Sequence, residues 1–417
     1  MVGLFGFTQT ILLITHVILS IFTAYLVLLT IAAYRAPKKP YKQLAKLTNF
    51  AFLIPAHNEE SLLPELLESI LKLDYPHSHF KIHVIADNCT DKTADIAAAY
   101  GANVHRRFNT DLIGKGYALQ WALDEIRQAD LQYDAFVVID ADSTISANFL
   151  KVMNEYVVGG AKVIQAYYTI EEPQLSWNIG LRYAAFAVLH FLRPQGRMTL
   201  GGSAGLKGNG MVFTPDILSQ FPWPVSITED IEYHMILLLN GFPVKFAPDA
   251  LVWTEMPIRF EQSHTQIERW EYGRLEMARK YVLPLIKAAA GAVKQKQPGR
   301  AFYLFDAAME HLIPPFSLMF GGAVLLLFVD SLFILGVLQF PLLSRIISIS
   351  WANLSLGVFL IGGQIYYLLA GLRLARAPKS IYRQLLFSPI FMLRKVGRYF
   401  RILGGNKPHG WVKTVRN

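Results

Sequence analysis

The chain has 417 residues, of which 53% are hydrophobic and only 17% are charged, and its formal net charge is +9. This composition is too apolar for an ordinary soluble protein and predicts a protein of the membrane. The single cysteine excludes an intramolecular disulfide.

Three apolar segments, residues 11–33, 312–340 and 346–372, are long enough to cross a membrane, because about 20 helical residues span the hydrocarbon layer. The first segment can also be read as a secretory signal peptide, but it lacks a basic leader and a small-residue cleavage site. Asp330 interrupts the second segment. A carboxylate is costly in hydrocarbon, so we expect Asp330 to face a partner or a sugar path, with an interfacial position as the alternative.

Basic residues follow the first and third apolar segments, so both of these flanks are predicted to face the cytoplasm. Residues 373–417 contain basic and aromatic side chains but no acidic one. Beside a membrane span, this pattern predicts an interfacial segment on anionic lipid, or a re-entrant one, rather than an arm that binds nucleic acid. The predicted organisation is a transmembrane helix over 1–36, a cytosolic domain over 37–300 and a C-terminal membrane region over 301–417.

Strands alternate with helices in the segment that follows the first span. The pattern predicts strands over 49–54, 82–86 and 135–139, with helices over 61–73 and 92–100 between them. This alternation is typical of an α/β fold with a mostly parallel sheet covered on both faces. A dinucleotide-binding sheet would need Gly-x-Gly-x-x-Gly after the first strand, where this chain has proline and glutamate instead.

Polar residues follow each predicted strand. The first strand runs into a segment with Pro55, Asn58 and Glu59, the second is followed by Asp87, and the third by Asp140 and Asp142. Ligands bind at the carboxyl ends of parallel strands, so we expect these side chains to meet at one edge of the sheet. The alternative is that the polar residues cap the helices that follow.

Two acidic motifs and one glycine-rich motif suggest chemistry at this edge. Asp140 and Asp142 offer hard oxygen ligands to Mg²⁺ or Mn²⁺ shared with a substrate diphosphate. Asp230, beside Glu229, stands before a predicted helix over 231–239 and suits a general base, with a helix cap as the alternative. The segment 114–116, Gly-Lys-Gly, opens a helix, so its amides and Lys115 can meet phosphate oxygens; it lacks the spacing of an ATPase phosphate loop.

Over nearly its whole length the chain resembles membrane-integrated family 2 glycosyltransferases, the group that contains cellulose, chitin, hyaluronan and poly-N-acetylglucosamine synthases and ceramide glucosyltransferase. The matching pieces are Pro55-x-x-Asn58-Glu59, Asp87, Gly114-Lys115-Gly116, Asp140-x-Asp142, Thr228-Glu229-Asp230 and Gln266-x-x-Arg269-Trp270. The resemblance implies a GT-A-type, Rossmann-like sheet domain flanked by transmembrane helices. It also implies a UDP-sugar donor and an acceptor that is a glycan or a lipid.

The resemblance assigns roles to these residues. Asp230 is the implied catalytic base, and Asp140 and Asp142 are implied to hold the metal and the diphosphate. Donor-binding residues are implied to be Pro55, Asn58, Glu59, Asp87, Lys115 and Asp140. A loop with Gln266, Arg269 and Trp270 is implied to close over the donor, with Arg269 at the diphosphate and Trp270 stacking on the acceptor. Glu229 is assigned to the same gating, acceptor and diphosphate group. A surface contact between arginine and tryptophan is the alternative for the last pair.

The expected function is transfer of a hexose or N-acetylhexosamine, with inversion, to a growing β-linked polysaccharide at the plasma (inner) membrane. The alternatives are a non-processive lipid glycosyltransferase and, from another class, an inactive membrane scaffold. Three spans are few for a polymer channel, so an oligomer or an accessory export subunit is a possible partner. Residues 201–210 lack the cysteine found in the acceptor motif of cellulose-type synthases, which leaves the acceptor open.

Overall fold

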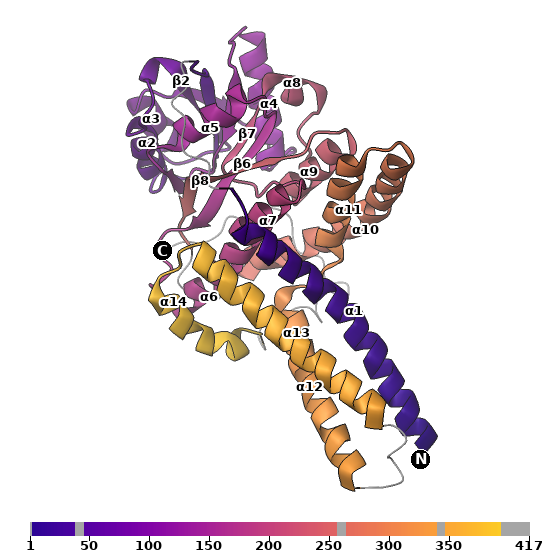
Figure 1. Cartoon of the computed structure of the whole chain (residues 1–417). Helices are drawn as coiled ribbons and strands as arrows, with labels where there is room; N and C mark the ends of the chain where they lie inside the picture. Colours follow the sequence, from indigo (N-terminus) through magenta and orange to yellow (C-terminus); the bar gives the residue numbers. More distant parts are fainter. Residues whose placement is uncertain (1, 38–45, 257–263, 340–346, 393–417) are drawn as a thin grey trace.

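The computed structural model describes residues 2–37, 46–256, 264–339 and 347–392. It contains an α/β body from which three long helices extend together, α1 (Val2–Tyr34), α12 (Phe316–Gln339) and α13 (Ile347–Leu374) (Figure 1). The basic residues within 38–45 and most of the predicted interfacial segment, 393–417, lie outside the described residues.

The body is built on one eight-stranded sheet, with strand order β3-β2-β1-β4-β7-β6-β8-β5. The strands are β1 (Phe50–Ala56), β2 (Phe80–Asp87), β3 (Asn103–Arg107), β4 (Ala135–Val138), β5 (Ser143–Ile145), β6 (Val163–Ile170), β7 (Met211–Phe213) and β8 (Lys245–Thr254). Strands β1–β4 pair in parallel, as do β6 and β8. Antiparallel pairs join β7 to β4 and β6, and β5 to β8. The prediction of a mostly parallel sheet is confirmed.

Helices cover both faces of the sheet because its strands are apolar on both sides. Phe50, Phe52 and Ile54 of β1 pack on one face with α2 (Leu63–Leu71) and α5 (Phe149–Val158). Ala51 and Leu53 point to the other face, against α4 (Lys115–Gln128) and α9 (Glu229–Leu239). Alternate side chains of one strand therefore pack into two hydrophobic cores, one on each face of the sheet. Other helices of the body include η1 (His77–His79), α3 (Thr93–Ala99) and α8 (Pro215–Gln220).

A helical segment after β6 joins the body to the long helices α1 and α13. It comprises α6 (Trp177–Phe186), the π-helical turn η2 (Ala187–Leu192) and α7 (Arg193–Thr199). Gly196 of α7 packs so closely on α1 that a Cβ there would lie 2.3 Å from the Leu29 carbonyl oxygen. Glycine is needed at this position because neither backbone can yield to a side chain.

Among the described residues, three helices, called the membrane helices below, are long and apolar enough to cross a membrane: α1 (Val2–Tyr34), α12 (Phe316–Gln339) and α13 (Ile347–Leu374). Asp330 of α12 is buried with its Oδ2 atom 3.0 Å from His16 Nε2 of α1, so the prediction that it faces a partner is confirmed. The predicted start of the second span at 312 is wrong. Helix α11 (Pro298–Leu312) ends there and α12 begins after Pro314 and Pro315, because proline cannot continue a helix from the preceding turn.

Candidate active site

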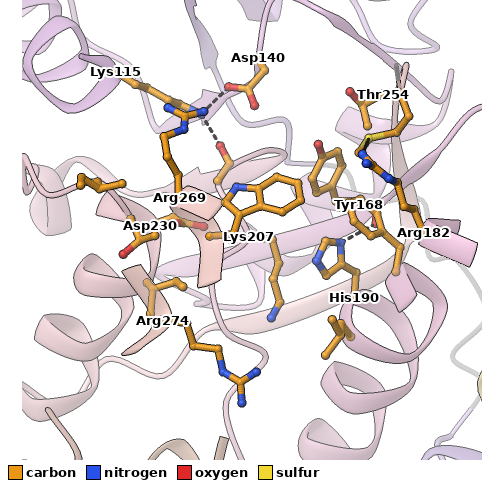
Figure 2. A pocket seen from close by; sticks show the side chains of 18 of the residues that line it. Lys115, Asp140, Tyr168, Arg182, His190, Lys207, Asp230, Thr254, Arg269 and Arg274 are labelled. Carbon is orange, nitrogen blue, oxygen red and sulfur yellow. Dashed lines mark hydrogen bonds and ion pairs between the residues drawn. The ribbon is translucent and has the colours of Figure 1, made fainter. Parts of the chain in front are cut away.

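A cavity of about 880 Å³ lies at the carboxyl edge of the sheet and reaches the start of α12. Its lining comes from the ends of β1, β2 and β4, the first turns of α4 and α9, helix α10 (His264–Lys294), and the junction with the membrane helices. Figure 2 shows these side chains converging from separate elements. The fold thus brings residues that are far apart in the sequence to one site.

Pro55, Glu59 and Asp87 line the cavity beside the ends of β1 and β2. Burial raises the pKa of Asp87, although Arg107 at 2.6 Å favours its ionised form. Arg107 ends β3, a strand that the sequence pattern did not reveal, so sequence reasoning missed this contact.

Asn58 is absent from the described residues that line the cavity. Its Oδ1 atom accepts a hydrogen bond from the Thr90 amide at 2.7 Å, and its backbone adopts a positive φ of 56°. In the structure, Asn58 therefore connects the segments that follow β1 and β2 by a hydrogen bond.

Lys115 begins α4 and points across the cavity. Its ammonium donates to Asp140 Oδ1 and to the Gly208 carbonyl (Figure 2). The turn into α4 needs glycine on both sides, because Gly114 has φ of 135° and a Cβ on Gly116 would lie 2.3 Å from the Pro224 carbonyl oxygen. The predicted helix start at this motif is confirmed.

Asp140 and Asp142 follow β4, and both line the cavity. The side chain of Asp140 is 33% exposed, and its backbone amide donates to Asn209 Oδ1 at 3.2 Å. Within the described ranges, no group of three or more His, Cys, Asp or Glu side chains forms a complete metal cage. Two carboxylates nevertheless fit Mg²⁺ or Mn²⁺, since such ions commonly take their remaining ligands from substrate phosphates and water.

Glu229 and Asp230 occupy the first turn of α9. Burial raises the pKa of both carboxyls, whereas the charge of Lys115 acts in the opposite direction. A Cβ on Gly208 would lie 3.3 Å from Asp230 Oδ2, so this glycine lets the chain pass directly beside the carboxylate. A carboxyl with a raised pKa is suited to accept a proton near neutral pH.

The predicted closing loop is helical in this structure. Gln266, Arg269 and Trp270 belong to the first turns of α10, where helix-favouring residues such as glutamate, arginine and leucine continue the helix. The side chain of Gln266 lies outside the described part. Arg269 has a buried Nε atom with no hydrogen-bond partner among the described residues, and Trp270 is 40% exposed with its ring 6.5 Å from that of Phe186.

Several cavity residues near the membrane helices were not predicted, among them His190, Arg193, Lys207 and Arg274. His190 stacks on Tyr168 with 5.4 Å between ring centroids, and burial lowers its pKa to about 3, so its ring is neutral. Arg274 lies one helical turn after Trp270, a spacing that puts both on neighbouring parts of one helix face. In the sequence, that spacing could have indicated that Arg274 belongs to the site. No comparable sequence pattern marks His190 or Arg193.

Comparison with known proteins identifies the family. The model of "Glycosyltransferase like family 2" matches residues 48–273. A probable glycosyltransferase, YdaM of Bacillus subtilis, is 26% identical over 70% of this chain and 68% of its own length. A poly-β-1,6-N-acetyl-D-glucosamine synthase of Staphylococcus epidermidis is 27% identical over 57% of each chain. A β-monoglucosyldiacylglycerol synthase of Nostoc is 28% identical over 47% of this chain and 42% of the relative, so the chain spans under two thirds of the last two proteins.

Among solved structures, a mannosyltransferase from Pyrobaculum calidifontis in complex with GDP-Man and Mn²⁺ is 17% identical, with a TM-score of 0.46 over 86% of this chain and 99% of that one. The family match covers more than half of the 417 residues and contains all eight strands. The chain therefore belongs to glycosyltransferase family 2, and its body is a GT-A-type domain joined to three helices of membrane-spanning length.

Proposed function

We propose that the protein transfers a hexose or N-acetylhexosamine from a UDP-sugar to a hydroxyl of a membrane-held acceptor, with inversion at C1. One observation carries the proposal: Gly208 lies between the Lys115–Asp140 pair and Asp230. Its carbonyl accepts from Lys115, which also binds Asp140, while its Cα faces Asp230. The candidate phosphate-binding lysine, metal-binding carboxylate and base thus adjoin one residue.

The donor would lie along the carboxyl edge of the sheet. Glu59 and Asp87 line the part proposed for the nucleoside. Lys115 and Arg269 are the cations proposed to meet the diphosphate. The buried Nε of Arg269, which has no hydrogen-bond partner among the described residues, supports that role. Asp140 and Asp142 would hold Mg²⁺ or Mn²⁺, which would stabilise negative charge on the leaving diphosphate. UDP as the nucleotide is implied by the resemblance to membrane-integrated family members.

The reaction would be a single displacement. The acceptor oxygen forms a bond to C1 of the sugar as the bond from C1 to the diphosphate oxygen breaks, and its electron pair leaves with UDP. Asp230 takes the hydroxyl proton. Burial, which raises the pKa of Asp230, makes the carboxylate a stronger base than an exposed aspartate. No side chain forms a covalent intermediate.

A lipid acceptor is supported by the course of the cavity. From Asp230 it continues to Pro314, Pro315 and Phe316, where α12 begins. An acceptor entering at this end would come from the membrane boundary. The β-monoglucosyldiacylglycerol synthase among the relatives has a glycolipid in its name, which agrees with such an acceptor.

A growing polysaccharide, the acceptor that the sequence analysis favoured over a lipid, is the second candidate. The aromatic rings of Trp270 and Phe186, 6.5 Å apart in the cavity lining, favour it because sugar rings stack on aromatic faces. This reading agrees with the poly-N-acetylglucosamine synthase among the relatives.

Product analysis tests the proposal. The full chain would be incubated in its membranes with radiolabelled UDP-glucose or UDP-N-acetylglucosamine, and the products extracted at early times. A chloroform-soluble product with one β-linked sugar supports the lipid acceptor, whereas a long chain at early times supports the polysaccharide. Release of UDP without labelled glycan or glycolipid would contradict both, as would an α-linked product for the inverting step.

A further inference from the structure

The end of the cavity nearest the membrane helices is lined by cations. Lys207 and Arg274 extend toward that end, away from Lys115 and Asp140 (Figure 2). The guanidinium of Arg274 donates to the carbonyl of Ile313, just before α12 begins at Phe316. This second basic region is therefore at the membrane junction and is separate from the proposed diphosphate site.

The acidic groups in this region already have partners. Arg193 binds Glu310 at 3.0 Å, and Arg197 binds both Asp306, at 3.1 Å, and Glu310. Although burial opposes ionisation of Glu310, Arg197 and Arg193 hold the pKa of this carboxyl well below its usual range. Glu310 also acts electrostatically on Lys207 and Arg274, but its ion pairs within 4.0 Å are with the two arginines of α7.

Lys207 and Arg274 form no ion pair within 4.0 Å with any carboxylate of the described residues. Burial lowers the pKa of Lys207 to about 8; Arg197 and Arg193 act in the same direction, whereas the charges of Glu310 and Asp230 oppose the shift without offsetting it. Burial also keeps the neighbouring rings of His190 and His311 neutral, since it lowers their pKa values to about 3 and about 4. Holding several cations close together in a buried cavity costs free energy unless an anion binds beside them.

We propose that Lys207 and Arg274 bind a phosphate group of the acceptor, and that the acceptor is a membrane lipid with its reactive hydroxyl beside that phosphate. The inference rests on the proposed function and specifies its acceptor class. An ammonium and a guanidinium together donate charge-assisted hydrogen bonds to phosphate oxygens. Lys207 precedes Gly208, whose Cα faces Asp230, so a phosphate at Lys207 leaves its neighbouring hydroxyl near the base.

The bound phosphate takes no part in bond making. The acceptor hydroxyl oxygen forms the bond to C1, the bond from C1 to UDP breaks with its electron pair on UDP, and the hydroxyl proton passes to Asp230. Phosphate recognition instead selects the acceptor and orients the hydroxyl. The nucleotide diphosphate has its own cations, Lys115 and Arg269, toward the sheet edge.

The test uses the full chain in neutral-detergent micelles with a labelled UDP-sugar and three acceptors: phosphatidylglycerol, diacylglycerol, and soluble glycerol phosphate. The variants are Lys207→Met and Arg274→Gln. Arg279→Gln is the matched control, because Arg279 is exposed on the same helix. Each test variant is expected to raise the KM for phosphatidylglycerol about tenfold or more, the effect of losing one charge-assisted hydrogen bond. The KM for the UDP-sugar stays unchanged, and Lys207→Arg recovers part of the loss.

Two kinetic results would overturn the inference. If diacylglycerol is glycosylated as efficiently as phosphatidylglycerol, the phosphate is not recognised. If soluble glycerol phosphate serves equally well, the acceptor class is not lipid. An increase in the KM of the UDP-sugar, with that of the acceptor unchanged, would assign both cations to the donor and also overturn the inference.

A binding measurement separates this inference from the proposed function. Native mass spectrometry would follow retention of phosphatidylglycerol by the full chain and the same variants. If no sugar is transferred but retention is lost in Lys207→Met and Arg274→Gln, the phosphate site stands and the proposed transfer reaction fails. If all variants retain phosphatidylglycerol equally, the proposal of a phosphate site is wrong, whether or not sugar transfer occurs.

Discussion

Lys115 donates a hydrogen bond to Asp140, so a carboxylate proposed to bind a divalent cation is already held by a lysine within the cavity proposed for the donor. Burial opposes the charge on Lys115, yet Asp140 and Glu229 raise its pKa and keep the ammonium charged. The positive charge needed beside a diphosphate is thus in place before the donor binds, and Asp140 is oriented toward that site.

Removal of divalent metal is expected to abolish transfer, because Asp140, Asp142 and a diphosphate repel one another without a cation. Activity would be measured in EDTA and after addition of Mg²⁺ or Mn²⁺, which should restore it. Asp142→Asn should raise the metal concentration needed for half activity. Full activity in chelator would eliminate the metal role of both aspartates.

Transfer is expected to decline as pH falls, at a pH above the ordinary aspartate range of about 4. Burial raises the pKa of Asp230 and Glu229, so the pair takes up protons at a higher pH than exposed carboxyls, and a protonated Asp230 cannot act as a base. The dependence of kcat/KM on pH would be measured for the native chain and Glu229→Gln. Removal of the neighbouring carboxyl should move the decline to lower pH; a native decline at pH 4 or below would contradict this account.

The KM for a phosphate-bearing acceptor is expected to rise above about pH 8, where Lys207 loses its proton. Lys207→Arg should abolish the rise, because a guanidinium stays charged. The groups whose charge or ring faces Lys207 are Glu310 of α11, Arg193 and Arg197 of α7, Asp230 and His234 of α9, His190 of η2 and His311 of α11. Their state should not change near this pH, because the histidines are already neutral and the arginines stay charged. An acceptor KM that is flat to pH 10 would contradict the role of Lys207.

Gly196→Ala is expected to lower the thermal stability of the full chain in detergent and to weaken the packing of α1 on α7. The added methyl would lie 2.3 Å from the Leu29 carbonyl oxygen, and a backbone atom cannot turn aside. Gly322→Ala in α12 is the matched control, since a Cβ there meets nothing within 4 Å. Equal melting temperatures for the two variants would show that this close approach does not limit packing.

The parts of the fold with strong local signals were predictable. Strands β1, β2 and β4 are short apolar runs that end in polar residues, and the membrane helices are long and apolar, so both were visible in the sequence. The three-residue strands β5 and β7 were not, because their pairing depends on neighbours that are distant in the chain. The same applies to Arg107, whose contact with Asp87 exists only because β3 pairs with β2.

The candidate site likewise contains residues that the sequence predicted and residues that only the structure revealed. Asp140, Asp142, Glu229 and Asp230 were predicted from motifs at strand and helix ends, and the structure places all four along one cavity. Lys207 and Arg274 lack a motif of their own. The two residues stand out because the nearby carboxylates form their ion pairs with Arg193 and Arg197. These ion pairs join residues that are distant in the sequence, so only the structure reveals them.

Replacement of Asp230 tests the central claim most directly. Asp230→Asn keeps the size of the side chain and removes the proton acceptor, so turnover should fall about 100-fold or more while UDP binding is retained. Asp249→Asn, at an exposed position away from the cavity, is the control and should behave like the native chain. The measurement is sugar transfer from a labelled UDP-sugar by purified full-length protein, with UDP affinity determined on the same samples. The account predicts loss of turnover with intact UDP binding in Asp230→Asn alone; native turnover in that variant would contradict it.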